Sequence, residues 1–302
     1  MRTKKREIII FIIVTLATLM IIGIFFNILK TKKDTTQANL FSLIAPSPYA
    51  ILKVNQPSSF SKYILSKPKT HTLFASTIPT IYLEIIQNHP TLEAAQISFH
   101  PQGIVFYAQA DDKKVTQITK ETLQKQFNSF APQTQTINEL TFTYYPDTDN
   151  NFLGCYHAQG IWVASYSQKL LEEVASTQFN RTKQELSVQK ELLKTLDQHV
   201  PLNLLLPTDS LNLYVSINDS TNWHIQNGWL GADLFSNDNH HCYSGSIPHH
   251  PVSDSLYLQI GDTLALRLQQ LFPQFNISNQ TSIESEHVFY SGCLIPLTDS
   301  IK

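Results

Sequence analysis

The sequence QISFHPQGIVFYAQ, residues 96–109, carries the clearest signal for the fold. Two stretches of strand composition flank Pro101-Gln102-Gly103, and glycine supplies the positive φ that a tight turn needs. The pattern predicts a β-hairpin made of Gln96–His100 and Ile104–Gln109. A second hairpin is predicted from FLGCYHAQGIWVAS, residues 152–165, which shares the pattern His-x-Gln-Gly-Ile with the first. The sequence therefore predicts two β-hairpins with similar turns.

A helical pattern follows each predicted hairpin. After the first, apolar residues recur at helical spacing from Val115 to Phe130; after the second, a helix is predicted from Ser167 through Val174. A strand is predicted between them at Glu139–Tyr145. Because the hairpins are local and strands do not alternate strictly with helices, the sequence predicts an α+β fold with a mainly antiparallel sheet.

A different repeat occurs in the C-terminal third. Asp209–Leu213 (DSLNL) resembles Asp254–Leu258 (DSLYL), and Tyr243-Ser244-Gly245 resembles Tyr290-Ser291-Gly292 at nearly the same separation. We expect a duplicated strand-and-hairpin unit within one sheet. Chance similarity in a chain rich in Ser, Leu and Tyr is the alternative.

The segment Ile8–Leu29 predicts a membrane anchor. It contains no charged residue, and as a helix of about 33 Å it would cross a hydrocarbon core of roughly 30 Å. It is longer than the apolar stretch of a cleaved signal peptide, and lysines rather than a small-residue cleavage site follow it. We therefore interpret it as an uncleaved signal anchor, with cleavage as the alternative. Four cations precede it and three follow, which favours a cytoplasmic N-terminus and a periplasmic or extracellular C-terminal part.

These patterns divide the chain into four parts. Residues 1–33 are predicted to be the cytoplasmic N-terminus and the transmembrane anchor, and residues 34–45 a tether. Residues 46–205 and 206–302 are predicted to form the first and second halves of an α+β ectodomain. The expected location is the inner membrane, crossed once.

The composition bounds the possible partners. The first 33 residues hold seven of the 22 Lys and Arg but only one of the 24 Asp and Glu, so the remainder carries eight more acidic than basic residues. An acidic domain lacks the concentrated basic face that nucleic acid requires, so no nucleic-acid partner is expected. Only 9 of 302 residues are glycine, and no phosphate loop, nucleophile elbow or dinucleotide fingerprint occurs. We expect no catalytic residue and no cofactor.

Histidines gather between His240 and His250. With Cys242 between the two pairs, His240, His241, His249 and His250 are weak candidates for a metal site, since imidazole and thiolate bind zinc and copper. The pattern predicts instead that His240 and His241 lie in a strand, where adjacent side chains point to opposite faces. The favoured prediction is therefore no metal site.

Two further sets of residues leave alternatives open. Trp223 and Trp229 could line a sugar- or peptide-binding surface, although filling the core beneath a strand is the favoured interpretation. Cys155, Cys242 and Cys293 are interpreted as small buried residues, and the sequence does not decide whether any two form a disulfide.

The chain resembles a class of uncharacterised bacterial envelope proteins that have one N-terminal signal anchor and a periplasmic α+β domain of unknown function. The resemblance is carried by the anchor, by Gly160–Ser165 leading into a helix at Gln168–Val174, and by Trp229-x3-Asp233-Leu234 before Tyr243-Ser244-Gly245. It implies location and fold class, and it carries no activity or functional residue.

Taken together, the patterns predict a membrane-anchored extracytoplasmic protein that is a non-enzymatic binding or scaffold module of the cell envelope. Its expected partners are the membrane and an envelope protein, peptide or glycan. The alternative is an extracytoplasmic metal-dependent hydrolase that uses the His240–His250 region.

Overall fold

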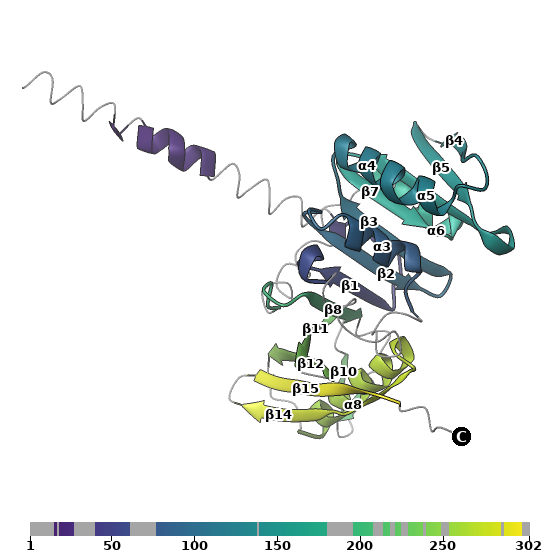
Figure 1. Cartoon of the computed structure of the whole chain (residues 1–302). Helices are drawn as coiled ribbons and strands as arrows, with labels where there is room; N and C mark the ends of the chain where they lie inside the picture. Colours follow the sequence, from purple (N-terminus) through teal and green to yellow (C-terminus); the bar gives the residue numbers. More distant parts are fainter. Residues whose placement is uncertain are drawn as a thin grey trace, which may run out of the picture.

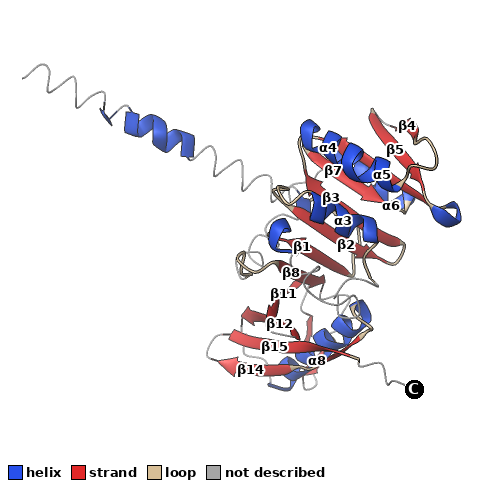
Figure 2. Ribbon diagram, viewed as in Figure 1, coloured by secondary structure: helices blue, strands red, loops and turns tan. Residues whose placement is uncertain are grey.

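The computed structural model describes residues 15–16, 18–26, 40–60, 77–137, 139–179, 196–207, 214–217, 221–224, 229–237, 240–248, 254–284 and 287–297. Within these ranges one large antiparallel sheet runs through the molecule, with helices packed on its faces (Figures 1 and 2). The predicted α+β class with a mainly antiparallel sheet is confirmed.

The first half of the sheet is built from seven strands and the helices between them. The strands are β1 (Ala50–Val54), β2 (Ala95–His100), β3 (Gly103–Gln109), β4 (Gln133–Ile137), β5 (Leu140–Pro146), β6 (Phe152–Ala158) and β7 (Ile161–Ser165). The helices are α3 (Thr80–Asn88), α4 (Asp112–Ile118), the π-helical turn η2 (Thr119–Leu123), α5 (Gln124–Gln126) and α6 (Gln168–Phe179), with a 3-10 turn, η3, at Thr148–Asn150.

The second half continues the sheet and adds one long helix. Its strands are β8 (Leu202–Pro207), β11 (Trp229–Asn237), β12 (His240–Pro248), β13 (Phe275–Ile277), β14 (Gln280–Glu284) and β15 (His287–Pro296), and its helix is α8 (Asp254–Leu271). A separate two-stranded sheet pairs β9 (Tyr214–Ile217) with β10 (Thr221–His224).

The order of strands joins the two halves without a break. The sheet of 13 strands runs β13-β15-β12-β11-β8-β1-β2-β3-β7-β6-β5-β4, and β14 also pairs with β15. β8 lies at the junction, antiparallel to β1 on one side and to β11 on the other. The two predicted halves of the ectodomain therefore share one sheet.

Both predicted hairpins are confirmed, and they lie side by side because β3 pairs with β7. The β6–β7 turn places Gln159 and Gly160 at φ values of 52° and 75°, the pattern of a two-residue turn with two left-handed positions. In the β2–β3 turn, Gly103 has a φ of 140° and already belongs to β3. The glycine in each pattern is thus needed for the backbone conformation.

The two faces of the sheet bury different sets of side chains. On one face, alternate residues such as Leu52, Ile97 and Phe106, which are direct cross-strand partners, form the main core beneath α3, η2 and α8. On the other face, α6 buries Leu170, Leu171 and Val174 against β3 and β7. This alternation follows from the two-residue period of a strand.

Several predicted elements differ from the observed ones. The first predicted helix ends at Gln126 rather than continuing to Phe130, whose side chain is 70% exposed. Residues 254–258, predicted as part of a strand repeat, begin helix α8 instead, and residues 209–213 lie outside the described residues. Leu256 and Ile260 are four residues apart, a spacing that places two side chains on one face of either a helix or a strand. The sequence pattern therefore could not distinguish the two structures.

The N-terminal region is described only in part. Of the predicted anchor, residues 15–16 and 18–26 are described, and they are helical. Among the residues that the structure describes, no helix has the length and hydropathy of a membrane span. Within the predicted tether, the side chains of Leu40, Leu43 and Ala45 are buried against the face of the sheet that α6 covers.

Candidate functional site

The residues proposed for a metal site are not brought together in the described part of the chain. His241, on β12, is buried, and its ring meets that of Phe275 edge to face at a centroid distance of 5.8 Å. His240 precedes it on the same strand, but the side chain of His240 lies outside the described residues, as do His249 and His250. The described ranges hold no group of three or more His, Cys, Asp or Glu side chains able to share a metal ion.

The two tryptophans proposed as a binding surface lie on different strands. Trp229, the first residue of β11, is half-buried and packs against a small apolar cluster of Phe41, Ile51, Leu196 and Leu205. Trp223 lies on β10, opposite Val215 of β9, and its side chain lies outside the described residues. Whether either tryptophan contacts a ligand stays a prediction.

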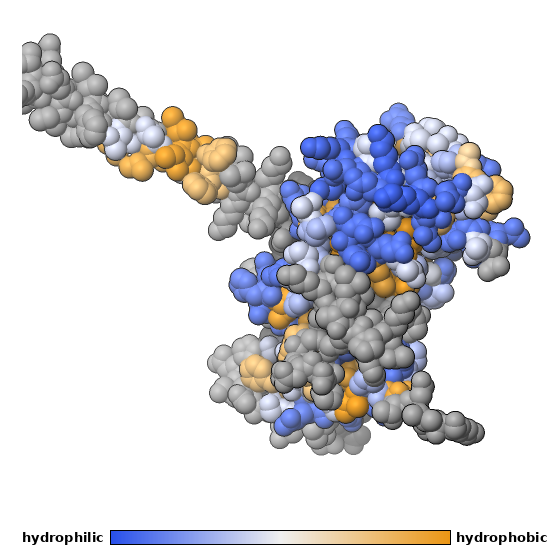
Figure 3. All heavy atoms as spheres, viewed as in Figure 1, coloured by the Kyte–Doolittle hydropathy of each residue, from blue (hydrophilic) through white to orange (hydrophobic). Residues whose placement is uncertain are grey.

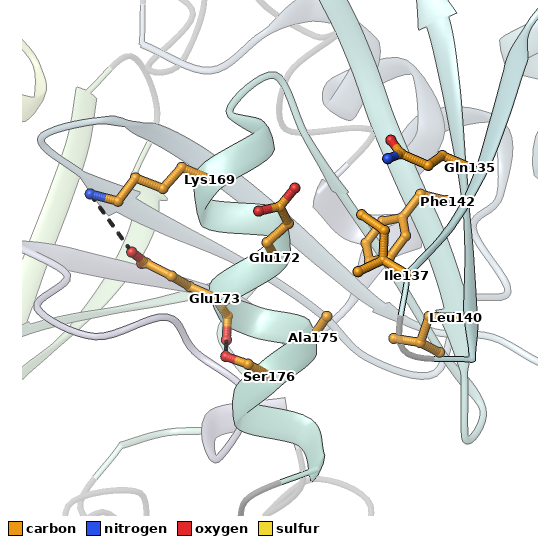
Figure 4. Close-up of a pocket in the computed structure, with 9 residues that line it drawn as sticks. All are labelled: Gln135, Ile137, Leu140, Phe142, Lys169, Glu172, Glu173, Ala175 and Ser176. Atoms are coloured by element: carbon orange, nitrogen blue, oxygen red, sulfur yellow. Dashed lines mark hydrogen bonds and ion pairs between the residues drawn. The ribbon is translucent and has the colours of Figure 1, made fainter.

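A hollow that the sequence did not indicate lies between the β4–β5 hairpin and α6 (Figure 4). Its volume is about 710 Å³. The hairpin contributes one wall and α6 the other, with side chains from both pointing into the space between them (Figure 4). The lining residues are Gln135, Ile137, Leu140, Phe142, Lys169, Glu172, Glu173, Ala175 and Ser176.

The register of the hairpin explains the apolar part of this groove. Gln135 pairs with Phe142 and Ile137 pairs with Leu140, so all four side chains point to one face, toward α6. Phe142 is held in place from below by Tyr156, at a ring-centroid distance of 5.2 Å. Ile137, Leu140 and Phe142 therefore form an apolar surface on the hairpin side of the groove, which we call its floor.

Charged side chains form the rim on α6. Lys169 and Glu173 make an i,i+4 ion pair of 4.0 Å, while Glu172 accepts a hydrogen bond of 2.8 Å from the amide of Gln168. Lys169 is 71% exposed, so this pair contributes little to stability. The rim carries two carboxylates and one ammonium group. Among the described residues no lysine forms an ion pair with Glu172, so its carboxylate is available to a cation of a ligand.

A partly buried tyrosine adjoins the rim. The hydroxyl of Tyr144 is buried with no hydrogen-bond partner in the described part of the chain. Burial, and secondarily the nearby Glu172 carboxylate, raise the pKa of Tyr144, so it stays a neutral donor. A donor left unpaired beside a groove is unusual, since buried polar groups are nearly always satisfied.

β4 forms the end of the sheet beside this groove. Within the described residues it pairs with β5 alone, so one side of its backbone is left without a strand partner. The side chains of Gln133 to Thr136 are exposed, and β4 contains neither a charged residue nor a proline. Natural edge strands commonly carry such residues to prevent pairing with other chains. β4 lacks that protection.

A second polar feature lies at the centre of the sheet and is structural. Asp233, Asn203, Lys53 and Gln96 are successive cross-strand partners on β11, β8, β1 and β2, and so form one row on one face. Asn203 donates to Asp233 at 2.7 Å and accepts from Asn55 at 2.7 Å. Burial raises the pKa of Asp233 and lowers that of Lys53. The row joins the two halves of the sheet.

The fold and these sites define an α+β protein with one continuous antiparallel sheet and an unprotected edge next to an apolar groove. No family model matches the chain, and no curated protein matches its sequence. Among solved structures, crystal form I of TP0453 is similar, with a TM-score of 0.45 and 9% identity over 84% of this chain and 92% of that chain. This likeness is one of coarse architecture, and nothing about activity or partners follows from it.

Proposed function

We propose that this protein is a membrane-tethered protein of the cell envelope that binds an extended peptide segment of a partner protein without catalysing a reaction. The peptide adds to the side of β4 that has no strand partner among the described residues, and it places its side chains in the groove between the β4–β5 hairpin and α6. The observation that carries this proposal is the coincidence of an unprotected edge strand with an apolar groove.

The tether is supported by the exposure of the N-terminal helix. Every large apolar side chain described between Leu16 and Phe26 is exposed, with exposed fractions of 46% to 70%. Figures 1 and 3 show this apolar segment extending away from the body of the protein. A lipid environment would remove that surface from water. The charges around Ile8–Leu29 favour a cytoplasmic N-terminus and an extracytoplasmic domain.

A membrane tether also lowers the affinity that the groove needs for a partner in the same membrane. A domain held close to the bilayer meets partners in the same membrane at a high effective concentration, so weak binding suffices. A short added strand makes a small interface, of the size of transient complexes. A non-enzymatic module that holds a neighbouring envelope protein fits both properties.

The groove indicates the chemistry of the peptide. Alternate side chains of an added strand would face the apolar floor, which is formed by Ile137, Leu140 and Phe142. The carboxylate of Glu172 favours a cation at the rim. The preferred segment is therefore about five residues long, matching β4, with apolar residues at the alternate positions that face the floor and a lysine or arginine at one end, near Glu172.

The test uses the full-length protein in detergent micelles and a fluorescent synthetic peptide that alternates valine and threonine and ends in lysine. We expect saturable binding by fluorescence anisotropy, weakened at least about tenfold by Ser176→Trp, which fills the groove from an exposed position on α6. The matched control is Gln126→Trp, exposed on α5 and outside the groove, and it should bind as the wild type does.

A second peptide separates strand addition from simple charge attraction. The same sequence methylated on alternate backbone nitrogens keeps its lysine but cannot pair with an edge strand. Equal binding of this peptide, or binding that Ser176→Trp does not weaken, would contradict the proposal. Saturable binding of a peptidoglycan fragment that Ser176→Trp weakens, without binding of the peptide, would assign the groove to a glycan instead.

The location is tested separately by protease accessibility. Protease added to intact spheroplasts should degrade the C-terminal domain, and the N-terminal fragment should remain in the membrane fraction. Recovery of the full-length protein in the soluble fraction, or complete protection of the domain, would refute the tethered orientation.

A further inference from the structure

Two cysteines that the groove does not use face each other on neighbouring strands. Cys242 of β12 and Cys293 of β15 are direct partners in the antiparallel register, and their Sγ atoms lie 2.7 Å apart. They are separated by 51 residues in the sequence, so the fold alone brings them together.

The backbone around Cys293 shows which type of cross-strand pair this is. The Cys293 N–H donates to Ser278 Oγ at 2.8 Å, and the Ser278 N–H donates to the Cys293 carbonyl at 2.9 Å. Both backbone groups of Cys293 therefore point away from β12. In an antiparallel ladder this makes Cys242 and Cys293 a non-hydrogen-bonded pair, whose Cα atoms lie about 4.5 Å apart. That spacing is within the range of about 4.4–6.8 Å that a disulfide spans.

The surroundings leave this pair accessible. Tyr243 and Leu294, the next residues on each strand, are buried on the core face, so the cysteine side chains point to the opposite face, where both are half-buried. Cys155 provides the contrast: it is 5% exposed, and burial raises the pKa of its thiol to about 12. A thiol of that kind is inert toward oxidants because the thiolate is the reacting form.

We propose that Cys242 and Cys293 form a reversible disulfide that staples β15 to β12. The oxidant is a disulfide compound, either a small molecule or an oxidoreductase. One cysteine thiolate attacks a sulfur of the oxidant, forming a mixed disulfide and releasing the first oxidant thiol. The second cysteine then attacks the protein sulfur of that mixed disulfide and releases the second oxidant thiol. Two protein thiols are oxidised to one disulfide, and one oxidant disulfide is reduced to two thiols.

The staple encloses a defined part of the fold. The closed loop contains α8, β13 and β14, and its closure fixes β15, the last strand among the described residues, to β12. An envelope location would supply oxidising conditions, which favour such bonds. The inference rests on the β12–β15 register and is independent of the peptide groove.

The test begins with the full-length protein, first reduced and then incubated with oxidised glutathione. After denaturation and alkylation with a maleimide, the reduced protein should carry three labels and the oxidised protein one, on Cys155. The intact mass should fall by two hydrogens, and a non-reduced digest should contain one peptide that joins Cys242 to Cys293. Dithiothreitol should restore all three labels.

Matched variants exclude other origins of the signal. Cys155→Ser should still form the bond and then carry no label after oxidation. Cys242→Ser should lose the bond and leave Cys293 either labelled or carrying glutathione. Three labels on the oxidised wild type, glutathione on both cysteines without a joined peptide, or a bond that includes Cys155 would overturn the proposal. A circular dichroism spectrum that is unchanged on oxidation and reduction shows that the protein stays folded during the measurement.

Discussion

The ring of Tyr290 lies directly on Gly245, its cross-strand partner on β12, with no room between them for a β-carbon. The reciprocal contact occurs two residue pairs away, where Gly292 faces the ring of Tyr243. The two copies of the Tyr-Ser-Gly repeat thus pair with each other in opposite directions, centred on Ser244 and Ser291. Each glycine makes the space that the tyrosine of the other copy fills.

Gly245→Ala should destabilise the protein because the added methyl group meets both the Tyr290 ring and the Gly231 carbonyl oxygen. Backbone and a buried ring cannot easily give way, so the expected loss is about 1–3 kcal/mol in the free energy of unfolding. Urea unfolding of the wild type and the variant measures it. Ser291→Ala, exposed on the same ladder, should change stability by less than about 0.5 kcal/mol, and a similar loss in both would contradict the argument.

Replacing each of these tyrosines with phenylalanine should lower the free energy of unfolding by different amounts, because their hydroxyl groups make different hydrogen bonds. Both tyrosines are buried, but Tyr290 donates to the buried Gly231 carbonyl at 2.6 Å, whereas Tyr243 donates at 3.0 Å to the carbonyl of Ser278, an exposed residue. Tyr290→Phe should therefore cost about 1–3 kcal/mol of unfolding free energy, and Tyr243→Phe about half as much. Equal losses in thermal or urea unfolding would show that the contribution of each hydrogen bond to the free energy of unfolding does not depend on its burial.

The hydrogen bonds of Asn203 stabilise the junction between the two halves of the sheet. Its side chain is fully buried and bonds Asp233, Asn55 and the Asp197 carbonyl. Asn203→Leu keeps the volume but leaves those groups without their partner, so unfolding should become easier by about 1–3 kcal/mol. Asn203→Asp, which retains an acceptor for Asn55 but places a carboxylate beside Asp233, should be worse at neutral pH and recover on acidification. No recovery in acid would contradict this account.

The hairpins and the fold class could be predicted because their signals are local: a glycine at a turn and apolar residues in regular spacing on either side. The groove and the polar row could not, because their members become neighbours only through strand register. Asn203 and Asp233 are 30 residues apart, and Gln133–Ile137 has no apolar alternation that would mark it as a strand. The Tyr-Ser-Gly repeat was visible, but the sequence could not show that its copies pair antiparallel to each other.

Two buried histidines predict how stability depends on pH. Burial lowers the pKa of His89, which hydrogen-bonds Thr122 at 3.1 Å, and that of His100, which hydrogen-bonds Ser98 at 2.8 Å. The unfolded chain then binds more protons than the folded protein below the ordinary value of 6.5. Stability should therefore fall as pH drops below 6.5. Urea midpoints at a series of pH values should show this slope, and the double variant His89→Gln, His100→Gln should flatten it. An equal slope in both proteins would assign the acid sensitivity elsewhere.

The proposed disulfide predicts a stability difference between two redox forms of the same chain. A bond between residues 51 apart removes conformational entropy from the unfolded state, worth about 4 kcal/mol in the chain-entropy account. The oxidised protein should therefore unfold at higher urea concentration than the reduced protein, and because less surface is exposed on unfolding of a cross-linked chain, its m-value should be smaller. Cys242→Ser should show no difference between oxidising and reducing buffers, and Cys155→Ser should keep the full difference. A redox effect of the same size in Cys242→Ser would mean that the stabilisation arises from another reaction of the protein, whereas its loss there and retention in Cys155→Ser would tie it to the β12–β15 pair.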